Sequence, residues 1–399
     1  MTAQTHSHVI ASQKSPLDSA VPQEEALSLE NLLGEQGSVR IGMDLQSLKG
    51  RKTGLGVYTQ ELLRAFSLAP PKDFQFRFYS RERNEDLNTP QRWFWENVEL
   101  PLRALRDKVR ILHTPAFAPP AIKCAKLVVT VHDLIGMLFP NSLRWPSALY
   151  WGKWLPWTLH KADAILADSE HTRKDLIRHL GIQEKKIRVI YLSGHEAFSS
   201  AISQASIGQV KKIYGIREKY YLFVGTLEPR KNLRRVIEAF GKFRRQHMTD
   251  ERYQLVIVGS KAYGHGEFFR SLAGPCGVTL EDVIFTGYVN HADLNALYSG
   301  AEIFVYPSLY EGFGIPILEA MASGTPVLAS TQTSVPEVTG EAAMLVDPCD
   351  ITQLVQAMAD LSKDPLLRKQ LIAKGFERIK RFSWKETARQ TLEVYRSLL

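Results

Sequence analysis

Cysteine is scarce in this 399-residue chain, occurring only at Cys124, Cys276 and Cys349. Three scattered cysteines fit neither a disulfide framework nor a zinc cluster, so we expect buried thiols and a reducing compartment. No uninterrupted apolar stretch approaches the roughly 20 residues of a membrane-spanning helix. The first residues also lack the basic-then-apolar layout of a secretory signal. These absences predict a soluble, cytoplasmic protein.

Signatures of two common ligand classes are missing as well. The formal charge of +8 and pI near 9.2 favour acidic partners. There is, however, no zinc finger or aromatic RNA-binding motif, which argues against nucleic acid. The absence of Gly-x-Gly-x-x-Gly with a distal acid argues against an NAD dehydrogenase.

The composition predicts a packed globular protein of two domains. Hydrophobic residues make up 44% and charged residues 23% of the chain, and 399 residues exceed one ordinary core. Residues 1–37 are polar and non-periodic, and we expect a mobile tail. A small polar stretch at 194–208 is the predicted linker between domains 38–200 and 208–383. A final helix, 384–399, is expected to cross back to the first domain.

Short apolar runs alternate with helical stretches in both halves, which predicts parallel sheets and the α/β class. We therefore expect two Rossmann-like, doubly wound domains that face each other across a cleft. The predicted strands are 39–44, 74–79, 111–113, 127–132, 164–167 and 187–190, then 221–224, 254–258, 283–285, 303–306, 326–329 and 344–346.

The strongest local signal is a pair of glutamates, Glu311 and Glu319, that follows a predicted strand. If a helix separates them, their carboxylates lie up to about 12 Å apart along its axis, which suits the two ends of an elongated ligand. Gly312, Phe313 and Gly314 lie at the helix entrance, where free N–H groups favour a diphosphate. The alternative is a capping glutamate and an unrelated surface glutamate; the glycines and the preceding strand favour function.

Adjacent cations, Arg230 and Lys231, lie between another predicted strand and a helix for which Asn232 is the expected N-cap. A planar guanidinium and a point charge together suit a leaving diphosphate. The alternative is a solvated basic turn.

Two weaker signals come from the first half. His132 is expected at the carboxyl end of a strand, where open α/β sheets bind ligands, although a buried structural histidine is the common alternative. Gly54 and Gly56 permit close approach of a ligand to the backbone, or form only a tight turn.

Together these motifs resemble the family-4 retaining glycosyltransferases of GT-B fold, over about residues 39–399. The resemblance implies that Glu311 lies by the donor sugar and that Glu319 holds the ribose hydroxyls. It also implies that Arg230 and Lys231 contact the diphosphate and that His132 lies near the sugar. The loop with Gly54 and Gly56 would approach the phosphates.

The chain departs from the family in two places. Many members have an arginine where this chain has Thr226. Arg230 would therefore have to supply more of the positive charge at the diphosphate. After the hinge strand, members often have Asn-Gly-Val-Asp, whereas this chain has Leu-Ser-Gly followed by His195, which leaves the hinge contacts open.

The resemblance implies a hexosyltransferase that retains anomeric configuration and takes its sugar from a nucleotide-sugar donor. The Glu-Pro-Arg-Lys-Asn variant resembles mannosyltransferases of bacterial surface polysaccharides, which favours GDP-mannose as the donor. The expected acceptor is a saccharide or a polyprenyl-diphosphate-linked saccharide. No Asp-x-Asp pair is present, so we expect catalysis without a metal or other cofactor. Alternatives are a GT-B-fold nucleotide-sugar epimerase and a non-catalytic basic protein that binds nucleic acid or a membrane surface.

Residues 145–157 contain four tryptophans and one tyrosine. Two interpretations stay open. The favoured one is an amphipathic helix packed into the first domain. The other is a peripheral contact with an anionic membrane, at the inner face of the plasma membrane, or with a lipid-linked acceptor. Basic residues that would meet the headgroups are Arg103, Arg106, Lys108 and Arg110.

Overall fold

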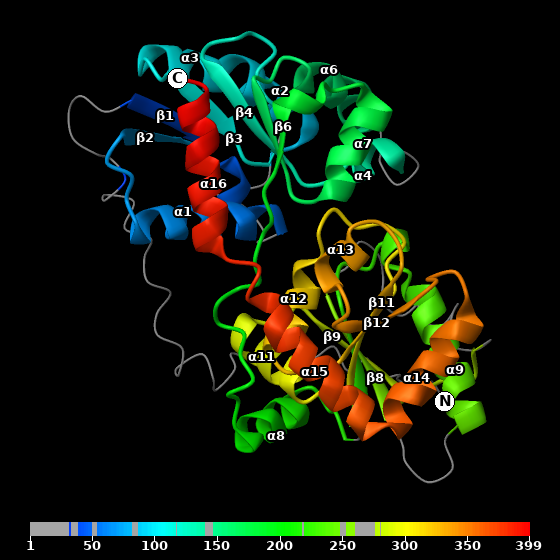
Figure 1. Ribbon diagram of the computed structural model, residues 1–399. Helices are drawn as coiled ribbons and strands as arrows, with labels where there is room; N and C mark the ends of the chain where they lie inside the picture. The colour runs from blue at the N-terminus through cyan, green and yellow to red at the C-terminus, as the bar shows by residue number, and fades with distance from the viewer. Residues whose placement is uncertain are drawn as a thin grey trace, which may run out of the picture.

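The protein forms two α/β halves, each built on a six-stranded parallel sheet (Figure 1). This computed structural model describes Leu32 and residues 39–49, 54–81, 87–116, 118–139, 147–217, 219–247, 253–259, 276–279 and 281–399. The predicted tail, 1–37, lies outside the described residues apart from Leu32. The predicted class, two doubly wound halves, is confirmed.

The first sheet has the order β2-β1-β3-β4-β5-β6, with every neighbouring pair parallel. Its strands are β1 (Val39–Asp44), β2 (Phe74–Tyr79), β3 (Ile111–Thr114), β4 (Lys126–Val131), β5 (Ala164–Ala167) and β6 (Ile187–Val189). All residues of β3 and β5 are buried, as expected for strands covered on both faces. The main helical segments are α1 (Gly54–Leu68), α2 (Thr89–Phe94), η4 (Trp95–Glu99), α3 (Leu100–Arg106), α4 (Ile135–Leu138), α5 (Ser147–Leu149), η6 (Tyr150–Trp154), α6 (Leu155–Leu159) and α7 (Glu170–Leu180), with short 3-10 turns η3 (Gln46–Leu48) and η7 (Glu184–Lys186).

The second sheet has the order β12-β11-β10-β7-β8-β9 and is also parallel throughout. Its strands are β7 (Lys219–Val224), β8 (Tyr253–Val258), β9 (Val283–Gly287), β10 (Ile303–Tyr306), β11 (Val327–Ser330) and β12 (Ala343–Val346). Helical segments in this half are α8 (Gln204–Ile213), η8 (Pro229–Lys231), α9 (Leu233–His247), α11 (His291–Ser299), α12 (Ile315–Ala322), α13 (Val335–Thr339), α14 (Ile351–Lys363) and α15 (Pro365–Ile379).

The last helix, α16 (Trp384–Ser397), lies against α1 of the first half (Figure 1). The Tyr395 hydroxyl is 2.6 Å from Nδ1 of the buried His113 on β3. Arg396 forms an ion pair with Asp73 at 2.7 Å. These contacts tie the end of the chain to the half in which it began.

The three cysteines are free, but only Cys276 is buried. Cys124 is half-buried and Cys349 is exposed, so the prediction of three buried thiols was wrong for two of them. Cys349 lies in the polar turn before α14, where no apolar neighbours are required.

Candidate functional site

The order of the second sheet creates a crevice between β7 and β10. The chain leaves β7 toward β8 on one side and leaves β10 toward β11 on the other. Ligands of open α/β sheets bind at such a switch point, outside the carboxyl ends of the strands. Arg230 and Lys231 follow β7, and Glu311 follows β10, so the topology places all three at this crevice.

These three side chains form a buried ion-pair cluster. Lys231 Nζ lies 2.7 Å from Glu311 Oε1, and Arg230 Nη1 lies 3.1 Å from Glu311 Oε2. Lys231 also donates to the Tyr306 hydroxyl at 2.7 Å. Burial alone would raise the pKa of Glu311, but the two cations lower it below its ordinary value. Glu311 is therefore ionised and pairs with both cations.

The side chain of Asn232 fixes the loop after β7 that carries the cations. Asn232 has φ 62°, and its side-chain Nδ2 donates to the carbonyls of Pro307 and Pro348, at 3.0 and 2.6 Å. It precedes α9 in a left-handed conformation, so the predicted N-cap role is wrong: an N-cap has extended backbone. Asn232 instead fixes the position of η8, which carries Arg230 and Lys231, against the loop after β10.

The Gly-Phe-Gly segment joins the cluster to the first half of the molecule. A Cβ at Gly312 would lie 1.9 Å from the carbonyl oxygen of His132, so only glycine allows this approach. Gly314 has φ 110° and precedes α12. The Phe313 side chain is buried against Tyr191 and Phe382, so any contact of Phe313 with a donor would come from its backbone.

Glu319 lies on α12, apart from the ion-pair cluster. It is buried, and the Tyr298 hydroxyl donates to its Oε2 at 3.2 Å. Burial raises the pKa of Glu319 to about 7. A buried carboxyl group with one hydroxyl partner retains acceptor capacity for a ligand that supplies hydroxyl donors.

His132 is the first residue after β4, at the carboxyl edge of the first sheet. Its Nδ1 lies 2.5 Å from Asp168 Oδ2, and its Nε2 lies 2.9 Å from the Pro115 carbonyl oxygen. Burial alone would lower the pKa of His132, but Asp168 and the hydrogen bonds raise it. Both nitrogens face acceptors, an arrangement that the imidazolium form satisfies. The ring of Tyr58 meets it edge-on, with centroids 4.7 Å apart.

The two glycines at the start of α1 differ in their surroundings. A Cβ at Gly56 would lie 2.8 Å from the Ser47 carbonyl oxygen, so packing within the chain already requires glycine there. Among the residues that the structure describes, none would lie within 4 Å of a Cβ at Gly54.

Further contacts hold the two halves together beside Gly312. Ser169 donates to the Gly312 carbonyl at 2.7 Å. Glu337 accepts from the backbone N–H groups of Glu170 and His171 at the start of α7, at 2.7 and 3.3 Å. A carboxylate at a helix N-terminus is favoured by the helix dipole. These bonds join the two halves beside Gly312.

Sequence reasoning missed Asp168 and Glu337. Asp168 directly follows β5, so the rule that selected His132 after β4 also applies to it. Glu337 carried no local signal, because its partners come from the other half of the molecule.

His195, the departure at the hinge, lies 3.3 Å from buried Glu61 and stacks on His291 with centroids 4.7 Å apart.

Two features bear on metal and membrane contacts. Across the described ranges, no group of three or more His, Cys, Asp or Glu side chains could hold a metal ion. None of the helices described is long and apolar enough to cross a bilayer.

The described part of the aromatic segment 145–157 is helical from Ser147. Tyr150 and Leu155 are packed in a first-half core cluster, whereas Trp157 is exposed.

Comparisons with known proteins show the family of the chain. Residues 206–378 match the family described as glycosyl transferases group 1, and residues 54–192 match glycosyltransferase family 4. The chain is 32% identical over 296 residues to O-antigen chain mannosyltransferase B of Escherichia coli, covering 74% of this chain and 76% of that protein. It is 31% identical over 280 residues to the serotype-specific mannosyltransferase WbdA of Escherichia coli, covering 69% of this chain but only 34% of WbdA.

A solved structure extends the likeness to nearly the whole chain. Anabaena HepE, determined in complex with UDP-glucose, superposes with a TM-score of 0.64 at 16% sequence identity. The match covers 90% of this chain and 100% of HepE. At that identity the likeness concerns the fold.

Proposed function

The chain belongs to the family-4 glycosyltransferases of GT-B fold, and from this premise we propose that it transfers mannose from GDP-mannose. The acceptor is a hydroxyl of a saccharide, either free or linked to polyprenyl diphosphate, and the anomeric configuration is retained. The mannosyltransferase names of the relatives support the sugar, and the UDP-glucose bound to HepE supports the donor class.

The single observation that carries the proposal is the buried cluster of Arg230, Lys231 and Glu311 at the switch point of the second sheet. Two cations held at a crevice can exchange a carboxylate partner for the diphosphate of a donor. Preorganised charges stabilise the negative charge that develops on a leaving diphosphate. Gly312 and Gly314 at the entrance of α12 add backbone N–H groups to this environment.

The proposed chemistry follows from these charges. The bond between C1 of the sugar and the diphosphate oxygen breaks, and the acceptor oxygen forms a bond to C1 on the same face. The acceptor proton passes to a diphosphate oxygen. Arg230 and Lys231 hold the departing diphosphate, Glu319 holds the ribose, and Glu311 and His132 lie by the sugar. Cationic side chains thereby take the role that a metal has in other transferases.

Transfer of labelled mannose tests this proposal. With GDP-mannose and a mannosylated lipid-linked saccharide, we expect product formation that EDTA leaves unchanged. Arg230→Ala should lower the rate about 100- to 1,000-fold, because it removes one preorganised cation. Arg368→Ala, which removes the partner of Glu302 at the opposite edge of the second sheet, is the matched control. Conversion of GDP-mannose without an acceptor would instead indicate the epimerase alternative.

We also propose a peripheral contact with anionic membranes through α3 of the first half, at the inner face of the plasma membrane. Leu102 and Leu105 are 61% and 54% exposed, and Arg106 next to them is exposed. Exposed apolar side chains can enter the interface of a bilayer, and basic side chains beside them can contact anionic headgroups. Sedimentation with anionic vesicles at low salt, reduced in Leu105→Ala, tests this contact; no sedimentation of the wild type would contradict it.

A further inference from the structure

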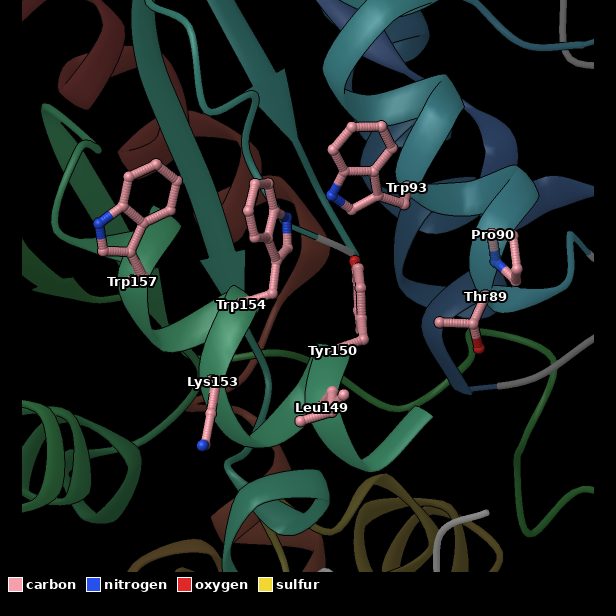
Figure 2. Close-up of a pocket in the computed structure, with 8 residues that line it drawn as sticks. All are labelled: Thr89, Pro90, Trp93, Leu149, Tyr150, Lys153, Trp154 and Trp157. Carbon is pink, nitrogen blue, oxygen red and sulfur yellow. The ribbon is translucent and has the colours of Figure 1, made fainter. Parts of the chain in front are cut away.

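An apolar groove lies in the first half of the molecule, outside the donor site. Its volume is about 490 Å³, within the range of small-molecule sites. Figure 2 shows its aromatic side chains facing one another from two helical segments. The lining residues are Thr89, Pro90, Trp93, Leu149, Tyr150, Lys153, Trp154 and Trp157.

Both helical segments that form the groove contain a π-helical turn. One is η4, which continues α2, and the other is η6, which continues α5. π-Helical turns are rare in proteins, and many of those known lie at functional sites. The extra residue in such a turn shifts side chains out of the regular helical register. Trp93 lies just before η4 and Trp154 ends η6, and their ring centroids are 5.6 Å apart.

Large apolar rings are exposed to solvent in the groove. Trp93 and Trp157 are 42% and 48% exposed, although each indole prefers burial. Two polar lining groups are already engaged, because Thr89 is bonded to Ser147 and the Tyr150 hydroxyl donates to Glu96, whereas the buried Trp154 Nε1 has no hydrogen-bond partner among the described residues. The lining therefore offers few partners to saccharide hydroxyls and suits an apolar chain.

Cations border the apolar surface. Lys153 is exposed and lines the groove (Figure 2). Lys161 Nζ lies 4.4 Å from the ring centroid of Trp157. An occupant that carries a phosphate beside its apolar chain would complement both features.

The groove is one helix away from the catalytic cleft. α4 begins two residues after Asp133, and a Cβ at Gly136 would lie 2.9 Å from Trp151. The segment that carries the groove therefore packs on the helix that continues from His132. The groove thus lies within one helix of His132.

We propose that this groove, lined by Trp93, Trp154 and Trp157, binds the apolar chain of a lipid-linked saccharide acceptor next to its phosphate. The acceptor part rests on the proposed function, whereas the binding of an isoprenoid phosphate does not. The bilayer contact on α3 involves other side chains, so the two can be separated by mutation.

Calorimetric titration of the full chain with geranylgeranyl diphosphate, below its micellar concentration, tests the groove. We expect Trp157→Ala to raise Kd about 10-fold and the Trp93→Ala, Trp157→Ala double variant about 100-fold, since each indole loses an apolar contact. Leu105→Ala is the control and should leave Kd within about 2-fold, and Arg230→Ala is measured separately to detect binding of the diphosphate at the donor site. Melting temperatures of all variants verify that they fold.

Several outcomes would overturn the proposal. These are no binding of geranylgeranyl diphosphate, equal Kd in the tryptophan variants, and a loss confined to Arg230→Ala, which would assign binding to the donor site. Displacement by mannobiose would make the groove a saccharide platform instead. A GDP-mannose thermal shift measured on the same variants keeps the two proposals distinct. Its absence in the wild type contradicts the proposed donor but not the groove.

Discussion

His132 offers neither ring nitrogen to a ligand in this structure, because Asp168 and the Pro115 carbonyl occupy both. A histidine held in this way contributes positive charge and shape to the cleft more readily than proton transfer. Its partner Asp168 is a positioning residue, because it acts through the imidazole. The charge of His132 should therefore depend on Asp168.

Replacing Asp168 by Asn should lower kcat about 10- to 100-fold and leave the KM for GDP-mannose within about 2-fold. Asp168 raises the pKa of His132, so its removal should move the loss of the imidazolium form to lower pH. A pH–rate profile of the wild type and Asp168→Asn measures both effects, and Asp168→Glu should restore part of the rate. An unchanged profile would mean that Asp168 has only a structural role.

Glu319 should make the unliganded protein less stable as pH rises. Its pKa is near 7 in the folded chain and near the ordinary 4.5 when unfolded, so the folded state binds the proton more tightly. Stability then falls as pH rises from about 4.5 to 7. Glu319→Gln should increase the free energy of unfolding at pH 8 by up to about 3 kcal/mol and change it little at pH 4.5.

Urea unfolding at the two pH values measures this difference. Glu341→Gln, whose side chain is exposed, is the matched control and should show no pH-dependent gain. A destabilised Glu319→Gln at pH 8 would contradict the raised pKa. The same variant should lose its response to nucleotide, because the amide no longer offers the carboxylate's acceptors.

At the scale of elements, the sequence was informative about strands because each is a short apolar run between polar turns. β2, β5 and β10 begin and end where the pattern predicts. The cations after β7 and Glu311 after β10 were likewise predicted, since loops at carboxyl ends of parallel strands meet at one edge.

Contacts between distant elements could not be predicted from local patterns. Gly54 and Gly56 look alike in sequence, yet only Gly56 is required by packing, against Ser47. Phe313 lies within the motif but packs on Tyr191 and Phe382, from the loop after β6 and the segment before α16. The roles of such residues depend on which distant elements pack against each other. The hydrophobic periodicity of the sequence gives no information on those contacts.

The tie between α16 and β3 predicts a stability effect. His113 is fully buried, and burial lowers its pKa to about 3, so the neutral ring needs a partner for Nδ1. Tyr395→Phe removes the hydroxyl that lies 2.6 Å away and should cost about 1–3 kcal/mol. Chemical denaturation of this variant measures the cost, with Ser397→Ala as a control. A cost below about 0.5 kcal/mol would show that water replaces the hydroxyl.

At the scale of the whole molecule, we expect activity to require the close approach of the two halves at Gly312. A methyl group there would lie 1.9 Å from the His132 carbonyl oxygen, so Gly312→Ala must separate the halves locally. Transfer should fall at least about 100-fold, because closure excludes water and completes the site. Binding of GDP to the second half should persist. Gly208→Ala, where a methyl group meets open space, is the matched control.

Transfer rates and GDP-induced thermal shifts of the two glycine variants measure this prediction. Retained transfer in Gly312→Ala would mean that the contact with His132 is not needed for the reaction. Loss of GDP binding together with transfer would place the defect in the donor site and not in closure.

The central proposal is a nucleotide-sugar site at the carboxyl edge of the second sheet, and nucleotide-dependent melting tests it most directly. GDP, UDP, ADP and their common sugar conjugates are titrated against the wild type and Glu319→Ala. A ligand that binds only the folded chain raises its melting temperature. We expect a selective rise with GDP and GDP-mannose that Glu319→Ala abolishes. No rise with any nucleotide, or an equal rise in Glu319→Ala, would contradict the proposed site.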